Sequence, residues 1–149
     1  MRVLIDTNVI VDVALEREEL VDDNQAVLDW CSARGTLAWV AWHTVTNGYY
    51  ILRSAPPKGL GDETASLFLS ELLEWAEIAP ATTGIARSGL GISGGDLEDH
   101  LLALCAEAIS VDLIFPRNGP DLKNSRVGDF PRPVPEGGRH RLNKALFKA

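Results

Sequence analysis

The chain has 149 residues, of which 46% are hydrophobic and 23% are charged, and this balance is typical of one folded globular domain. It argues against intrinsic disorder, and no apolar stretch approaches the roughly 18 residues needed to cross a membrane. Two cysteines are too few for a disulfide framework or a cysteine-rich zinc site, so we expect a cytoplasmic protein.

The net charge of −7 is divided unevenly along the chain. Residues 1–116 carry 6 Lys or Arg and 18 Asp or Glu, whereas residues 117–149 carry 8 Lys or Arg and 3 Asp or Glu. An acidic body can hold a cation, and a basic segment can hold a polyanion. A solvated basic extension would have the same charge, so charge alone leaves both interpretations open.

Apolar residues recur along the chain in two patterns. Short apolar runs predict buried strands at residues 2–5, 36–41, 77–79 and 111–115. Helical spacing predicts helices around residues 9–14, 24–31, 44–53, 64–75, 83–90 and 97–108, with Asp23 or Asn24 as the N-cap of the second. Strands that alternate with helices predict a parallel sheet with helices on both faces. After Pro116 only one short strand is expected, near Val134.

Acidic and amide side chains follow the first and last predicted strands. Asp6 comes directly after the first strand, and Asn118 and Asp121 come shortly after the last. Asp96 and Asp99 lie at the start of the helix around residues 97–108. Because sites in parallel sheets form beyond the carboxyl ends of the strands, we expect these groups at one rim. Clustered carboxylates need a cation, and oxygen ligands select Mg²⁺ or Mn²⁺, which predicts metal-assisted phosphodiester hydrolysis with a metal-activated water.

Helix capping offers a simpler explanation for two of these acids. Asp6 and Asp96 each precede a predicted helix, and Asp is a favoured N-cap residue. His100, beside Asp99, is expected to be a surface or half-buried residue rather than a metal ligand. Trp39 and Trp42 fit the strand alternation poorly, so one of them could be exposed on a partner surface, although tryptophan is more often a core residue.

Four segments, in this order and spacing, resemble the PIN domain family, and most of all its VapC-type branch. They are residues 5–10 (IDTNVI), 44–52 (TVTNGYYIL), 96–99 (DLED) and 114–118 (IFPRN), and the resemblance covers roughly residues 1–121. It implies a three-layer α/β/α sandwich around a short parallel sheet, with a PIN-like domain at 1–130 and a basic C-terminal extension at 131–149. It also implies a Mg²⁺- or Mn²⁺-dependent endoribonuclease, the toxin of a type II toxin–antitoxin pair. The expected partners are RNA, a cognate antitoxin and a second copy of the chain.

The resemblance assigns roles to individual residues. Asp6 and Asp99 match metal ligands, and Asp96 matches an accessory catalytic carboxylate. Asn47 stands where many members have Glu, Asn118 where many have Asp, and Pro116 replaces a common Thr or Ser. Asn can coordinate through its carbonyl but brings no charge, so we expect a weaker metal site. The further accessory positions are Asn8 and Asp121, and the expected RNA-binding residues are Arg117, Lys123 and Arg126.

Three other functions share single features with this sequence. A phosphatase of the haloacid-dehalogenase type needs a second Asp two residues after the first, where this chain has Asn8. A dinucleotide-binding domain needs a glycine-rich turn after the first strand, and none occurs there. The remaining alternative is a PIN-like module that has lost catalysis and works by binding RNA or protein, for which Asn47 and Asn118 would be expected.

Overall fold

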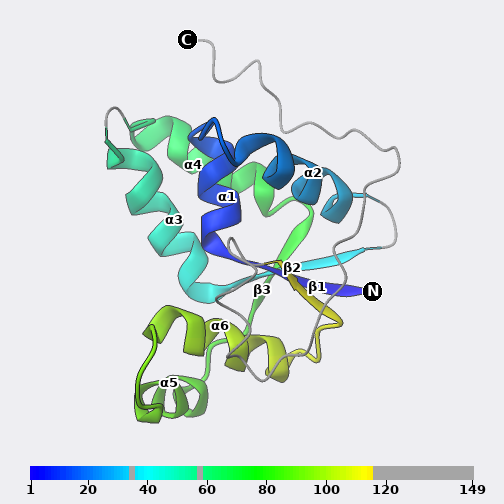
Figure 1. Ribbon diagram of the computed structural model, residues 1–149, viewed down its shortest axis with the longest axis vertical. Helices are drawn as coiled ribbons and strands as arrows, with labels where there is room; N and C mark the ends of the chain where they lie inside the picture. The colour runs from blue at the N-terminus through cyan, green and yellow to red at the C-terminus, as the bar shows by residue number, and fades with distance from the viewer. Residues whose placement is uncertain (34–35, 57–58, 116–149) are drawn as a thin grey trace.

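The computed structural model describes residues 1–33, 36–56 and 59–115, and a four-stranded sheet lies at its centre (Figure 1). The strands are β1 (Arg2–Ile5), β2 (Leu37–Ala41), β3 (Ala76–Ala79) and β4 (Leu113–Phe115). They pair in the order β3-β2-β1-β4, and every neighbouring pair is parallel. All four strands therefore end at one edge of the sheet.

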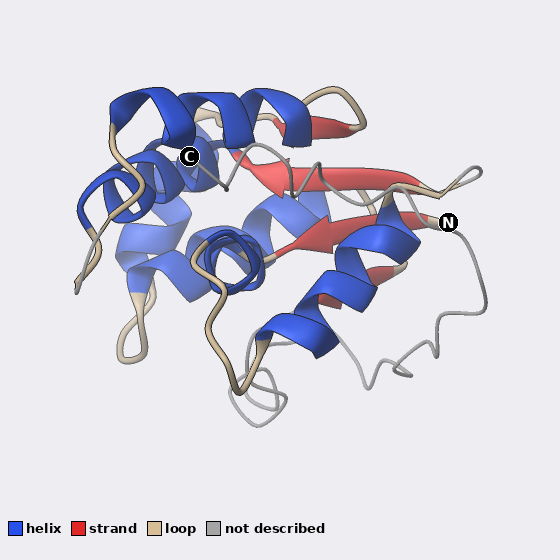
Figure 2. Cartoon of the chain, turned by 90° about the horizontal axis from the view of Figure 1, so that it is seen from above, coloured by secondary structure: helices blue, strands red, loops and turns tan. Residues whose placement is uncertain are grey.

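Helices cover both faces of this sheet. They are α1 (Thr7–Ala14), α2 (Val21–Cys31), α3 (Trp42–Ser54), α4 (Asp62–Leu72), α5 (Thr83–Gly91) and α6 (Leu97–Ala108). In Figure 1 α1 to α4 lie above the strands and α5 and α6 below them, and Figure 2 shows the strands side by side with helices around them. The three-layer α/β/α architecture expected from the sequence is confirmed.

Successive side chains of a strand point to opposite faces of the sheet, so the apolar core consists of two clusters, one on each face. Val3 and Ile5 of β1 pack in the larger apolar cluster with residues of α1 to α4. Leu4, between them, packs in the second cluster with Leu102 and Cys105 of α6. Side chains of a strand point alternately to opposite faces, and here each face is covered by helices. The apolar run of residues 2–5 is therefore the signature of a strand that is buried on both sides.

The predicted element boundaries hold to within two or three residues, with one clear error. The second helix was expected to begin with Asp23 or Asn24 as its N-cap, but α2 begins at Val21 and Leu20 is its N-cap residue. Asn24 instead donates a hydrogen bond from its side chain to buried Asp12. A tertiary partner for the Asn24 amide thus outweighs its local capping preference.

Two expectations concern residues outside the described part of the chain: the short strand near Val134 and the division at residues 130 and 131. Among the described residues, none of the helices combines the length and apolar character needed to cross a membrane.

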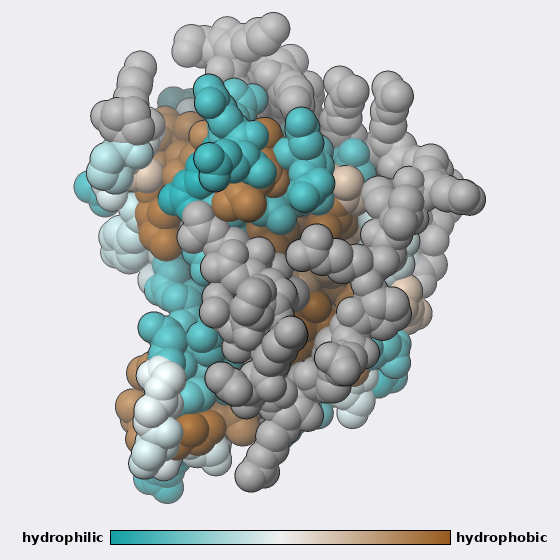
Figure 3. Space-filling view, viewed as in Figure 1, coloured by the Kyte–Doolittle hydropathy of each residue, from teal (hydrophilic) through white to brown (hydrophobic). Residues whose placement is uncertain are grey.

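Apolar side chains are exposed around α5, where Leu90 is 71% exposed, and they form the brown area at the lower left of Figure 3.

Candidate active site

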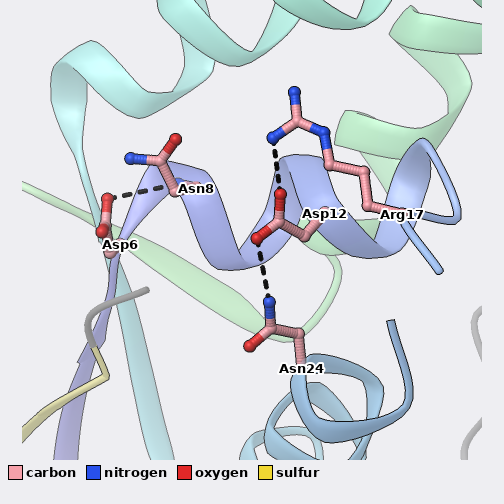
Figure 4. A network of polar contacts seen from close by, with 5 residues as sticks. All are labelled: Asp6, Asn8, Asp12, Arg17 and Asn24. Atoms are coloured by element: carbon pink, nitrogen blue, oxygen red, sulfur yellow. Dashed lines mark hydrogen bonds and ion pairs between the residues drawn. The ribbon is translucent and has the colours of Figure 1, made fainter. Parts of the chain in front are cut away.

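Asp6 lies at the carboxyl end of β1, where the chain turns directly into α1. Its backbone N–H donates to the carbonyl of Phe115 at 3.0 Å, so the ladder between β1 and β4 continues up to this residue. Its carboxylate accepts a hydrogen bond from the backbone N–H of Asn8 at 3.2 Å, as an N-cap does (Figure 4). The side chain is 9% exposed. Asp6 therefore is a cap, and it also occupies the sheet edge at which sites form.

The start of α3 packs against the start of α1 at the same edge. The register pairs Ile5 of β1 with Val40 of β2, so these two strands end side by side. The hydroxyls of Thr7 and Thr44 are 2.9 Å apart and form a buried hydrogen bond. This bond joins the first turns of the two helices, and it holds α3 close to Asp6.

His43 joins the start of α3 to the start of α6. Its ring is buried, with 6% of the residue exposed, and its Nε2 is 3.8 Å from Oε1 of Glu98. Within the described residues neither ring nitrogen of His43 has a hydrogen-bond partner, and neither has Oε1 of Glu98. Burial lowers the pKa of His43 below its ordinary value, and the Glu98 carboxylate opposes this shift. The imidazole is therefore held in its neutral form at neutral pH.

A turn that contains two glycines precedes α6, which begins at this edge of the sheet. Gly94 and Gly95 have φ values of 76° and 79°, a left-handed conformation that glycine adopts without strain. Asp96 follows as the N-cap of α6, and its carboxylate accepts from the backbone N–H of Glu98 at 2.7 Å. Asp99 lies in the first turn of α6 and is exposed, and His100 is half-buried as expected.

The first turns of α1, α3 and α6 thus come together at the carboxyl edge of the sheet. The contacts between Thr7 and Thr44 and between His43 and Glu98 establish this arrangement. The N-terminus of a helix carries a partial positive charge and unpaired N–H groups, so it favours anions, phosphate included. The edge therefore combines acidic side chains with backbone positions that favour phosphate.

The described part of the site contains five of the predicted residues. Asp6, Asn8, Asp96 and Asp99 lie in the first turns of α1 and α6 or directly before them, and half-buried Asn47 lies in the second turn of α3. The other predicted positions lie outside the described residues: Arg117, Asn118, Asp121, Lys123 and Arg126.

The donor chemistry of the described residues fits a hard divalent cation. Mg²⁺ keeps several waters and is commonly bound through one or two carboxylates plus substrate phosphate, and Asp6 and Asp99 supply such oxygens. Within residues 1–33, 36–56 and 59–115, no group of three or more His, Cys, Asp or Glu side chains is arranged to hold a metal ion. Within these ranges a metal ion would therefore be held by fewer than three such side chains in one place.

Sequence reasoning missed His43, Glu98 and the pair of threonines. One signal was available, because Trp42 and His43 follow β2 directly, just as Asp6 follows β1. The structure also identifies the exposed tryptophan: Trp42 is 40% exposed, whereas Trp39 is partly buried against the second apolar cluster.

Asp12 belongs to a separate polar network on the same helix. It is 0% exposed and accepts from Nη1 of Arg17 at 2.6 Å and from Nδ2 of Asn24 at 3.1 Å. Figure 4 shows Asp6 at the start of α1 and Asp12 farther along, facing α2. This network ties α2 to α1 and lies away from the sheet edge.

Comparison with known proteins agrees with this architecture. The family model of the PIN domain matches residues 2–119. A search of curated proteins finds no match. Among solved structures, a chain of the crystal structure of VapBC2 from Rickettsia felis bound to a DNA fragment from their promoter is similar. It shares 18% identity over 85% of this chain and 95% of that chain, with a TM-score of 0.57, a likeness of fold. The chain belongs to the PIN domain family.

Proposed function

We propose that this protein is a divalent-metal-dependent endoribonuclease of the VapC type, the toxin of a type II toxin–antitoxin pair. One observation carries the proposal: Asp6 directly follows β1, a central strand of a PIN-domain sheet, at the point where the first turns of α1, α3 and α6 meet. Carboxylate oxygens and helix N-termini in one place suit a cation and a phosphodiester together.

Each residue has a definite part in the proposed reaction. Asp6 and Asp99 would hold Mg²⁺ or Mn²⁺, and Asp96 would be an accessory carboxylate. When bound, the metal supplies an activated water and neutralises charge on the phosphate. Asp6 is positioned for this by its bond to the Asn8 backbone and by the pairing of its own N–H with Phe115. The accessory oxygen positions are Asn8, Asn47, Asn118 and Asp121.

The proposal extends to substrate and partners. RNA phosphates would be held by Arg117, Lys123 and Arg126, which open the basic part of the chain. A cognate antitoxin and a homodimer are proposed as protein partners, and the similar solved structure, a VapBC2 complex bound to promoter DNA, supports the first. The PIN-like domain would span residues 1–130, and 131–149 would be a basic extension.

A cytoplasmic location is also proposed. The described thiols of Cys31 and Cys105 are buried and not joined in a disulfide. Burial raises the pKa of Cys31 to about 12, which keeps this thiol protonated and unreactive. Reduced, inert cysteines are typical of proteins in a reducing compartment.

A PIN-like module that has lost catalysis and works by binding RNA or protein is the second candidate. It is favoured by Asn47, a half-buried amide on α3 where a carboxylate would strengthen a cation site. An amide oxygen is a neutral ligand, so each such position lowers the charge that attracts a cation. The two candidates differ in cleavage.

The decisive experiment incubates the purified full chain, free of antitoxin, with labelled single-stranded RNA and Mg²⁺ or Mn²⁺. We expect cleavage, and we expect Asp6→Asn to reduce its rate by at least about 100-fold, because a metal-held oxygen contributes several kcal/mol to the transition state. Asp23→Asn is the matched control, since Asp23 is an exposed acid on α2. Binding of RNA that weakens with salt, without any cleavage, would favour the non-catalytic module. Neither binding nor cleavage of RNA would reject the ribonuclease and leave only the protein-binding form of the module.

A further inference from the structure

Trp42 is an exposed aromatic residue at the rim of the candidate active site. It is the first residue of α3 and follows the last residue of β2, Ala41. The first turn of α3 lies beside that of α1, where Thr7 and Thr44 form their buried hydrogen bond, so Trp42 lies at the same edge of the sheet as Asp6. Trp42 nevertheless stays 40% exposed, although its neighbours His43 and Thr44 are buried.

The indole is supported by the buried side of the site. The rings of Trp42 and His43 meet edge to face, with centroids 5.7 Å apart and planes at 89°. His43 is itself buried and lies 3.8 Å from Glu98. An aromatic ring that already rests on a fixed neighbour loses little conformational freedom when a ligand covers it. Trp42 is therefore a preorganised aromatic surface.

This placement suits a nucleobase. The adjoining helix N-termini favour phosphate, and in a single strand each phosphate is followed by a base within one nucleotide. Unpaired bases stack on aromatic side chains, and every base has a face that can do so. The body of the chain is acidic, with 18 Asp or Glu against 6 Lys or Arg in residues 1–116, so affinity that needs no positive charge is useful there.

From these observations we infer that Trp42 stacks on an unpaired base of the RNA substrate, next to the phosphodiester that lies at the helix N-termini around Asp6. The inference rests on the proposed ribonuclease function. It assigns Trp42 to substrate binding, and it requires the base to be unpaired, because the face of a base in a duplex is already covered by its neighbours.

The test measures binding of a fluorescein-labelled 12-nucleotide oligouridylate to the full chain carrying Asp6→Asn, so that the probe stays intact. Adding Trp42→Leu should weaken binding by about tenfold, because the base loses the aromatic ring on which it stacks. The slope of log affinity against log salt should stay unchanged, because no phosphate contact is removed. A duplex of equal length should bind equally to both proteins.

Tyr50 provides the matched control. It is a 58% exposed aromatic residue on the same helix, two turns farther from the sheet edge, and Tyr50→Leu should leave binding unchanged. Trp42→Phe keeps an aromatic ring and should retain binding within about threefold, while the quenching of tryptophan fluorescence by RNA is reduced. This conservative variant keeps the test usable if the leucine variant unfolds.

The outcomes separate the inference from the proposed function. If the wild type cleaves RNA and Trp42→Leu binds the probe as tightly as its parent, stacking is rejected and the ribonuclease remains. If Trp42→Leu changes the oligomeric state measured by light scattering and leaves RNA affinity per chain unchanged, Trp42 is a protein contact and the inference is wrong. If the wild type neither binds nor cleaves RNA, the proposed function and the inference both fail.

Discussion

Asp12 and His43 are both buried polar residues, but their surroundings differ. Asp12 accepts hydrogen bonds from Arg17 and Asn24, which supply the positive charge and the donors that a buried carboxylate needs. His43 lies at the sheet edge with neither ring nitrogen hydrogen-bonded within the described residues, and Glu98 beside it has one such buried oxygen. Buried polar groups that have hydrogen-bond partners stabilise the folded state. Buried polar groups without such partners need another explanation, such as a ligand.

The largest stability effect should come from the satisfied region. Asp12→Ala should lower the free energy of unfolding by about 2–3 kcal/mol, because it leaves the buried amide of Asn24 without its acceptor and separates Arg17 from its charge partner. The partial exposure of Arg17 keeps the effect below that of a fully buried pair. Urea unfolding measures it, and the folded variant should still cleave RNA. A loss below about 0.5 kcal/mol would remove the contrast between the two regions.

A smaller effect is expected where a charge is added to the proposed cation site. Asn118→Asp should tighten Mn²⁺ binding by about tenfold, or about 1.4 kcal/mol, since a carboxylate replaces a neutral amide. Isothermal titration calorimetry measures the affinity, and Asn143→Asp is the control with the same change of charge elsewhere. Equal affinity in both variants would show that position 118 is not at the site.

Asp96 offers a way to separate capping from catalysis. Asp96→Ala should cost about 1 kcal/mol of stability, because the N–H of Glu98 loses its acceptor. Asp96→Ser retains a capping oxygen and should keep the stability of the wild type. If Asp96 is also an accessory carboxylate, cleavage by the serine variant should fall by about tenfold. Unchanged cleavage by that variant would make Asp96 a cap and nothing more.

The smallest effect is a pH dependence that originates at His43. The pKa of His43 is lowered in the folded protein, so below about pH 6.5 the unfolded chain binds a proton that the folded chain does not. Stability should therefore fall as the pH drops below this value and level off beneath the folded-state pKa. Glu98→Gln should enlarge the fall, because it removes the charge that opposes the shift, and His43→Gln should abolish this component. Urea unfolding at about pH 7.5 and about pH 5 provides the measurement. The same pH response in the wild type and in His43→Gln would contradict it.

The predictable parts of this protein are those that depend on local pattern. The run of residues 2–5 and the stripe of α6 are visible in the sequence, because burial on a strand or helix imposes a period. Asp6 was identified because parallel strands bring their carboxyl ends to one edge. The start of α2 was misplaced because the side chain of Asn24 donates a hydrogen bond to Asp12 on α1. Capping preferences depend on neighbours in the sequence and do not predict such a contact between helices.

The rest of the site depends on how helices lie across one another. The approach of His43 to Glu98 joins positions 55 residues apart and exists only because α6 starts beside the first turn of α3. The network of Asp12 similarly requires α2 to be packed on α1. Periodicity predicts which face of a helix is apolar, but it does not determine which polar residues of two different helices will meet.

The pairing of β1 with β4 has a consequence for the order in which the protein is made and folded. The backbone N–H of Arg2 donates to Asp112, 110 residues later in the chain, and that of Asp6 donates to Phe115. Contacts between such distant positions slow folding, because a long loop must close before they can form. During synthesis Asp6 is made more than a hundred residues before its neighbour on β4, Phe115. A growing chain therefore cannot assemble this edge of the sheet until residue 115 has been added. A truncated product that ends earlier contains Asp6 but lacks the strand that pairs with it.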